Sequence, residues 1–456
     1  MARYLGTSLV LLVMALTTIS PSHGFLGTEK KVKSAVFLSQ KLEMNPGSVI
    51  NSFFYDMDFP RGHIGVKSFD AEVVDESGNS VPLHETYLHH WAVVPYYQRK
   101  GFKLSPRDMP RNLVVGSKQD PDRNLVLGSR SNIIIVNNAG LCNTAVRPFF
   151  GKGSETRKTS TYAPDPYAIE FDNPEERPDG YELKWLLNIH AIDTRGVVDK
   201  SGCTECRCDL YNVTIDEYGR TIKPDYQGGL NCCYHKTQCR VRNGFDNGDK
   251  TRSLYLKYTV GWVDWDSSVV PVKVYSLDIT DTWERKEGST GDIHEHDCPV
   301  EYNVKPCKTN GDGCVDVKKK SFMMPFDGYV VFGVVHQHAG GLGGALYRED
   351  GEGIFTSMPE YGNGVEPGNE AGYIVGISSC YPQEPVKVSY GETLTFESNY
   401  SNAVGHTGVM GIFHLLVAQQ LHEPEISLPA LFQVKAAVVY RRQNREDGYH
   451  YQSLST

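Results

Sequence analysis

The most strand-like run of the chain reads Tyr329-Val330-Val331-Phe332-Gly333-Val334-Val335-His336-Gln337-His338 and ends with two histidines. β-Branched and aromatic residues dominate this run, which is typical of a β-strand. Because residues i and i+2 of a strand lie on the same face, His336 and His338 can both reach one metal ion without backbone distortion.

Similar runs recur on both sides of this segment, separated by turns rich in Gly, Pro, Asn and Asp. They include residues 71–74, 132–136, 254–260 and 270–275. Long amphipathic helical patterns are missing, and the chain contains 44 glycines. This pattern predicts an all-β fold of two tandem jelly-roll-like β-sandwich domains. We expect the first over residues 25–265, the second over 266–440, and a polar tail at 441–456.

Composition and charge narrow the classes of function. Of 456 residues, 40% are hydrophobic and 22% are charged, which is typical of a globular protein. The formal charge is −9, from 46 basic and 55 acidic residues. Nucleic acids and anionic membranes attract an excess of Lys and Arg, so neither is expected as a partner.

The first residues have the features of a secretory signal. Arg3 precedes an apolar run at residues 9–16, and Ser22 and Gly24 provide small residues at the expected cleavage site. We therefore predict a signal peptide over 1–24 and a secreted, extracellular protein. No later segment reaches the ~20 apolar residues of a transmembrane helix. Two glycosylation sequons, at Asn212 and Asn399, agree with this compartment.

All eleven cysteines follow the predicted signal peptide, and an oxidising compartment favours disulfides. Because the number is odd, at least one is free, intermolecular or a metal ligand. Six fall within residues 197–250, which we interpret as a cross-linked insertion, and Cys298, Cys307 and Cys314 fall within a second polar segment. A zinc site at Cys203, Cys206, Cys232 and Cys233 is the alternative, although secretion favours disulfides. The pairing is not determined by the sequence.

The histidines offer the clearest potential for chemistry. His89 and His90 are adjacent within a strand-like run, and His190 ends another. Imidazole nitrogen suits copper, zinc, iron or nickel. Adjacent residues of an ideal strand point to opposite faces, so a metal shared by His89 and His90 requires a strand end or a β-bulge. A second His-x-His, His294-Glu295-His296, lies in a polar loop and illustrates the alternative of ordinary surface histidines.

The order of these residues along the chain resembles the order of metal ligands in a known family. His89-His90, His190, His336-x-His338 and Met410 follow one another over residues 80–415. This order resembles the copper type II, ascorbate-dependent monooxygenases, the family of peptidylglycine and dopamine hydroxylating enzymes, which have two tandem β-sandwiches. The whole chain is also similar to the plant stress-up-regulated nodulin type of secreted proteins.

The resemblance implies two copper sites. His89, His90 and His190 would hold an electron-transfer copper, and His336, His338 and Met410 an oxygen-binding copper. Ascorbate would supply electrons and a small substrate would be hydroxylated. Without the resemblance, Met410 reads as ordinary β-sandwich core. The chain departs from the family at Val334, where those enzymes have Arg, and at Ile412 and His414, where peptide-acting members have Asn and Tyr. These departures argue against peptide amidation.

Three functions are compatible with these patterns. The first is a secreted copper-dependent monooxygenase-like protein acting on a small substrate. The second is a non-catalytic secreted copper-binding or cell-wall stress glycoprotein on the same scaffold. The third is a structural glycoprotein without metal. The presence of all six residues of the implied ligand set favours the first function. The departures from the family at the substrate-binding positions favour the second function.

Overall fold

The computed structural model describes residues 31–104, 132–142, 147–159, 161–245, 251–283, 296–308 and 313–421. Within these ranges the chain forms 21 strands, two short α-helices and one 3-10 helix, which confirms the all-β fold. The predicted signal peptide and the polar tail lie outside the described residues. None of the helices in these ranges has the length and apolar character of a membrane span.

One long sheet runs through the whole molecule. Its central path is β1-β10-β4-β8-β11-β21-β14-β19, with β2 paired to β10 and β12 paired to β21. The bounds are β1 (Lys33–Leu38), β2 (Leu42–Met44), β4 (Ile64–Asp75), β8 (Tyr167–Phe171), β10 (Arg252–Asp264), β11 (Val270–Asp278), β12 (Glu301–Val304), β14 (Gly328–Gln337), β19 (Val386–Val388) and β21 (His406–Ala418). The five runs that the sequence predicted as strands all coincide with strands, in β4, β6, β10, β11 and β14.

A five-stranded sheet covers the first half of the long sheet. It has the order β3-β9-β5-β6, with β7 paired to β5. The strands are β3 (Val49–Tyr55), β5 (Thr86–Arg99), β6 (Ile133–Ile135), β7 (Phe150–Lys152) and β9 (Tyr181–Asp193). The two sheets pack through aromatic rings, since Phe69 of β4 lies 4.9 Å from Trp91 of β5 and 5.2 Å from Phe150 of β7, ring centroid to ring centroid. Together they form the first β-sandwich.

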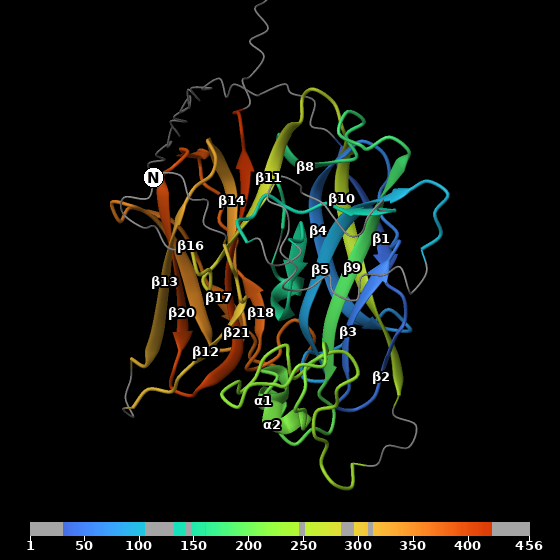
Figure 1. Ribbon diagram of the computed structural model, residues 1–456, viewed down its shortest axis with the longest axis vertical. Coiled ribbons are helices and arrows are strands. Elements are labelled where there is room, and N and C mark those ends of the chain that lie inside the picture. Colours follow the sequence, from blue (N-terminus) through green and yellow to red (C-terminus); the bar gives the residue numbers. More distant parts are fainter. Residues whose placement is uncertain are drawn as a thin grey trace, which may run out of the picture.

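A four-stranded sheet covers the second half of the long sheet in the same way. It has the order β13-β20-β15-β16, from β13 (Val315–Met323), β15 (Gly341–Arg348), β16 (Gly353–Ser357) and β20 (Thr393–Ser401). Phe413 of β21 packs 5.4 Å from Phe396 of β20. A separate pair, β17 (Pro359–Tyr361) and β18 (Ile374–Ile377), lies outside the three larger sheets. Figure 1 shows the two halves side by side.

The two halves are joined within the long sheet. β8 pairs in parallel with β11 through Tyr167 with Val270 and Ala168 with Pro271. The predicted domain boundary after residue 265 falls in the turn between β10 and β11. The two halves therefore share a continuous hydrogen-bonded sheet. Val334 and His336 of β14 line one pocket with Phe150 and Lys152 of β7 in the first half.

Five disulfides stabilise the fold. Three are nested in the cysteine-rich insertion and join Cys203 to Cys239, Cys206 to Cys233, and Cys208 to Cys232. The others join Cys142 to Cys298 and Cys307 to Cys314. The insertion also contains α1 (Lys200–Thr204) and α2 (Cys208–Tyr211), which lie at the lower end of the view in Figure 1. The expectation of a cross-linked insertion is confirmed, and Cys380 is the free cysteine.

Candidate metal centre

The adjacent histidines lie at an irregularity of β5. The pairing of β5 with β9 runs regularly to Leu88 opposite Ala191 and then shifts, so that His90 lies opposite His190 and His89 is the additional residue. This is the bulge that a shared site for His89 and His90 requires. A bulge re-aims one side chain without ending the strand, so two neighbouring rings can lie close to the same point.

The other two histidines lie at the end of β14. Val335 is paired with Phe413, which faces the four-stranded sheet, and His336 is paired with Ile412 on the opposite face. His338 follows one residue after β14 ends, and its ring centroid lies 5.3 Å from that of His336. Alternation along the strand therefore turns this pair toward the first sandwich.

The structure brings all five predicted histidines into one cluster between the two halves. Ring centroids lie 4.4 Å apart for His89 and His190, 5.0 Å for His90 and His190, and 4.6 Å for His89 and His338. The closest nitrogens of His89, His90 and His190 all lie within 4.8 Å of one another. The resemblance suggested two groups, and the contact between His89 and His338 places those groups beside each other.

Several ring nitrogens of this histidine cluster lack a hydrogen-bond partner among the described residues. They are Nδ1 of His89, Nε2 of His338 and, apart from a looser contact with the Cys233 backbone, the nitrogens of His190. Buried polar atoms are normally paired, because an unsatisfied one costs about 1–3 kcal/mol. Three buried rings that each keep a nitrogen available match imidazole ligands of a transition metal.

Burial keeps these rings in their neutral, metal-binding form. It lowers the pKa of His338 to about 3 and that of His90 to about 4. The pKa values of His89 and His190 also fall well below 6.5, because burial and then the positive charge of neighbouring imidazoles oppose protonation. At neutral pH these four imidazoles have lone pairs available for a metal ion.

Two polar side chains orient rings of the cluster. Oε1 of Glu155, in η1 (Ser154–Arg157), lies 2.6 Å from Nδ1 of His336, and its other oxygen accepts a 2.9 Å hydrogen bond from the Gly153 amide. Burial alone would raise the pKa of Glu155, but the facing His336 holds it below the usual value. Nε2 of His90 lies 2.8 Å from Oδ1 of Asn188. Such partners fix which nitrogen of a histidine remains available to a metal.

Met410 lies close to this cluster along the backbone. It is buried, and it precedes Ile412 by two residues on β21, so it lies on the same face of the sheet as His336. The Tyr400 hydroxyl donates to the Met410 carbonyl at 2.5 Å and accepts from the His338 amide at 2.8 Å. One hydroxyl group therefore holds the backbones of His338 and Met410 together.

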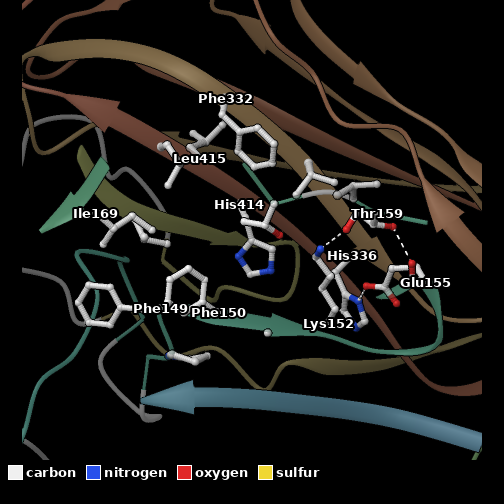
Figure 2. A pocket seen from close by; sticks show the side chains of 17 residues that line it. Phe149, Phe150, Lys152, Glu155, Thr159, Ile169, Phe332, His336, His414 and Leu415 are labelled. Carbon is white, nitrogen blue, oxygen red and sulfur yellow. Dashed lines mark hydrogen bonds and ion pairs between the residues drawn. The ribbon is translucent and has the colours of Figure 1, made fainter. Parts of the chain in front are cut away.

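A largely apolar pocket borders the cluster at His336. The free space within it accommodates only about two water molecules. Figure 2 shows its polar groups, His336, Glu155, Lys152 and His414, facing walls that include Phe149, Phe150, Ile169, Phe332 and Leu415. Burial lowers the pKa of Lys152 to about 8 and that of His414 to about 4. His336 therefore lies beside a narrow, mainly apolar pocket.

Histidines away from the cluster have ordinary polar partners. His63 lies 2.7 Å from Glu170, His406 lies 2.6 Å from Glu205, and His414 lies 2.9 Å from Ser276. His296, from the second His-x-His, lies 2.5 Å from Asp281, and His294 lies outside the described residues. His90 and His336 of the cluster have such partners as well, whereas His89, His190 and His338 have buried ring nitrogens without a side-chain partner among the described residues.

Sequence reasoning missed two residues of the site, Glu155 and Asn188. Glu155 follows Lys152-Gly153-Ser154, a stretch without a strand or helix pattern that would indicate a functional carboxylate. Asn188 carries a weak signal, because it is a polar residue two positions before His190 in an otherwise apolar run. Because side chains alternate between the two faces of β9, Asn188 lies on the same face as His190.

Comparisons with known proteins include a match to a family model. A model of the family described as stress up-regulated Nod 19 matches residues 30–420. No curated protein matches the chain. Among solved structures, the Sputnik virophage shares 10% identity over 91% of this chain and 92% of that chain, with a TM-score of 0.22. The infectious bursal disease virus VP2 subviral particle shares 8% identity over 86% and 72%, with a TM-score of 0.17. Likenesses this weak support no conclusion about fold or function.

Proposed function

The chain belongs to the stress up-regulated Nod 19 family, and we propose that it is a secreted copper-dependent oxidoreductase. In this proposal it oxidises a small substrate with dioxygen, and a reductant such as ascorbate supplies the electrons. The family alone indicates no chemistry, so the proposal depends on the histidine cluster and the pocket beside it.

The observation that carries the proposal is the contact between His89 and His338, whose ring centroids are 4.6 Å apart. These residues come from different sheets, and each has a buried ring nitrogen without a partner among the described residues. Neither strand alone provides more than two histidines, and the packing of the two halves assembles five. Buried, neutral imidazoles of this number suit copper, and a thioether ligand from Met410 would favour its reduced state.

The residues present fit a copper centre. His89, His90, His190, His336 and His338 would hold the metal, with Met410 as a further ligand from the same sheet face. Copper in such a site would supply one-electron redox chemistry and a binding position for dioxygen. Two ions, if both bind, would share this one cluster.

The protein's own groups would prepare the site for oxidation. Glu155 accepts a hydrogen bond from Nδ1 of His336 and so leaves Nε2 of that ring available. In His90 the roles of the two ring nitrogens are reversed. Asn188 contacts Nε2 of this ring and so leaves Nδ1 available. The apolar walls around His336 would limit the access of water to the centre. Lys152, which lines the same pocket, would attract an acidic or phenolic group of a substrate that approaches the centre.

Copper content and ascorbate-dependent oxygen uptake of the purified protein test the proposal together. We expect bound copper after dialysis and oxygen uptake that rises with a suitable small apolar substrate. His338→Ala should lose copper and uptake. His63→Ala, which alters a histidine paired with Glu170 outside the cluster, should retain both. Equal copper content in wild type and His338→Ala would contradict the proposal.

A non-catalytic copper-binding protein is the second candidate. The burial of His89, His190, His336 and His338 favours it, because a closed coordination sphere binds metal without giving a substrate access. Val334, Ile412 and His414 favour it as well, since they replace the substrate-contacting residues that the hydroxylase resemblance implies. Copper bound at the cluster without oxygen uptake across a panel of small aromatic and aliphatic substrates would support this candidate.

A further inference from the structure

The middle disulfide of the cysteine-rich insertion lies against the histidine cluster. Cys206 and Cys233, which form it, are fully buried, and His89 is 1% exposed. The two sulfurs and a ring nitrogen of His89 all lie within 4.8 Å of one another. Cys206, Cys233 and His89 therefore form a further group of potential metal ligands, which shares His89 with the histidine cluster. The disulfide bond keeps the two sulfurs from binding a metal.

The neighbouring disulfides do not share this position. Cys203–Cys239 encloses the middle bridge in the sequence, and Cys208–Cys232 lies within it. Within the described part of the chain, neither of these two bridges forms a comparable group with a histidine. Contact with His89 is thus specific to one bridge of three, although all three belong to the same small segment.

We propose that Cys206, Cys233 and His89 form a redox-controlled binding site for a soft metal ion, Zn²⁺ or Cu⁺. Two thiolates and one imidazole are a typical ligand set for these ions, whereas a disulfide is a poor ligand. The site would be closed in the oxidised protein and open after reduction. It does not depend on the proposed oxidoreductase activity, because metal binding by the thiolates requires no dioxygen or substrate.

The opening reaction is a two-electron reduction of the Cys206–Cys233 bond. Two small-molecule thiols supply the electrons and become a disulfide, and the two cysteines take up the protons. Metal binding then displaces both thiol protons, so bound metal stabilises the reduced form.

The nested arrangement allows the middle bridge to open without loss of the insertion. Cys208–Cys232 and Cys203–Cys239 continue to hold the same two chain segments together on either side. The Tyr211 hydroxyl also donates to the Cys203 carbonyl at 2.7 Å, and Asp199 caps the start of α1. Two released sulfurs would therefore stay close to His89.

Cobalt(II) is a suitable probe, because it substitutes for zinc and gives an intense thiolate-to-metal charge-transfer band. The full chain would be treated under argon with limiting dithiothreitol and then with Co²⁺. We expect the band in the reduced protein and its absence in the oxidised protein. The Cys206→Ser/Cys233→Ser double variant should lose the band, and the matched Cys208→Ser/Cys232→Ser double variant should keep it. A band that is absent from reduced wild type, or equal in both double variants, would overturn the proposal.

A second measurement uses wild-type protein, so its result does not depend on the folding of any variant. After the same limited reduction, released thiols are alkylated with and without Zn²⁺ and mapped by mass spectrometry. Protection of Cys206 and Cys233 by Zn²⁺ supports the site, and alkylation of both at unchanged rates overturns it. Copper bound by the oxidised protein is measured separately, so a failure of the copper proposal remains distinguishable from a failure of the thiolate site.

Discussion

Nδ1 of His336 lies 2.6 Å from Oε1 of Glu155, although the two residues are 181 positions apart in the sequence. His336 comes from β14 of the second half, and Glu155 from the 3-10 helix that follows β7 in the first. This hydrogen bond crosses between the two halves and fixes the orientation of a candidate metal ligand.

Glu155→Gln tests this orienting role. The amide keeps the size of the side chain but loses the charge, so it holds the His336 ring less strongly. We expect copper affinity to fall by about 10–100-fold, which is the usual effect of removing such a partner of a ligand. A competition titration with a chromophoric copper chelator measures this change.

Glu205→Gln is the matched control for that variant. Glu205 lies at the same 2.6 Å from Nδ1 of His406, which is not a proposed ligand. Its replacement should leave copper affinity unchanged within error. An equal loss of affinity in both variants would mean that Glu155 acts through general stability instead of through His336.

Met410→Leu tests whether the Met410 thioether acts as a ligand. Leu has a similar volume, so we expect stability to change by less than about 1.5 kcal/mol. Cu⁺ affinity should fall by roughly tenfold, equivalent to about 1.4 kcal/mol, with Cu²⁺ affinity almost unchanged, because the soft sulfur favours the reduced ion. Met324→Leu, at a core position that is 1% exposed, serves as control. Parallel loss for both oxidation states would argue against a Met410 ligand.

Metal-free protein should lose stability as the pH falls below about 6.5. Burial lowers the pKa of His338 to about 3 and of His90 to about 4, so the folded state resists protons that the unfolded chain accepts. Between its unfolded and folded pKa values, each such histidine therefore lowers the free energy of unfolding by about 1.4 kcal/mol for every pH unit of acidification. Thermal unfolding at pH 7 and pH 5 measures this loss. His338→Gln should reduce the difference, and an unchanged difference in that variant would contradict the assignment.

Glu301 should have the opposite pH dependence. Burial raises the pKa of Glu301 to about 8. Hydrogen bonds from the Leu230 amide and the Tyr226 hydroxyl lower this pKa, but their effect is smaller than that of burial. The folded state then keeps a proton that the unfolded state releases near 4.5, and stability falls as the pH rises from that value to about 8.

Glu301→Gln cannot ionise and should remove this dependence. We expect unfolding free energies close to wild type at pH 5 and roughly 1–3 kcal/mol higher than wild type at pH 8, measured by urea denaturation. Glu352→Gln, at an exposed position, should follow wild type at both values. A Glu301→Gln variant that is less stable than wild type at pH 8 would show that the carboxylate form is the favoured one.

The local features of this protein could be predicted from its sequence. Strand β14 follows from its β-branched and aromatic residues, and the shared face of His336 and His338 follows from the two-residue period of any strand. The irregularity at His89 could be anticipated in the same way, because adjacent residues reach one site only through a bulge. The cysteine-rich insertion could be recognised from its six cysteines within residues 197–250.

Which of these local features meet depends on tertiary packing. The approach of His89 to His338 requires two sheets to associate, and a period of two residues does not specify which sheet faces oppose each other. The nested disulfide pairing and the position of Glu155 have the same origin, because residues distant along the chain come together only when the sheets associate. Sequence periodicity fixes the direction of a side chain relative to its own strand, and the packing of strands from both halves fixes what that side chain contacts.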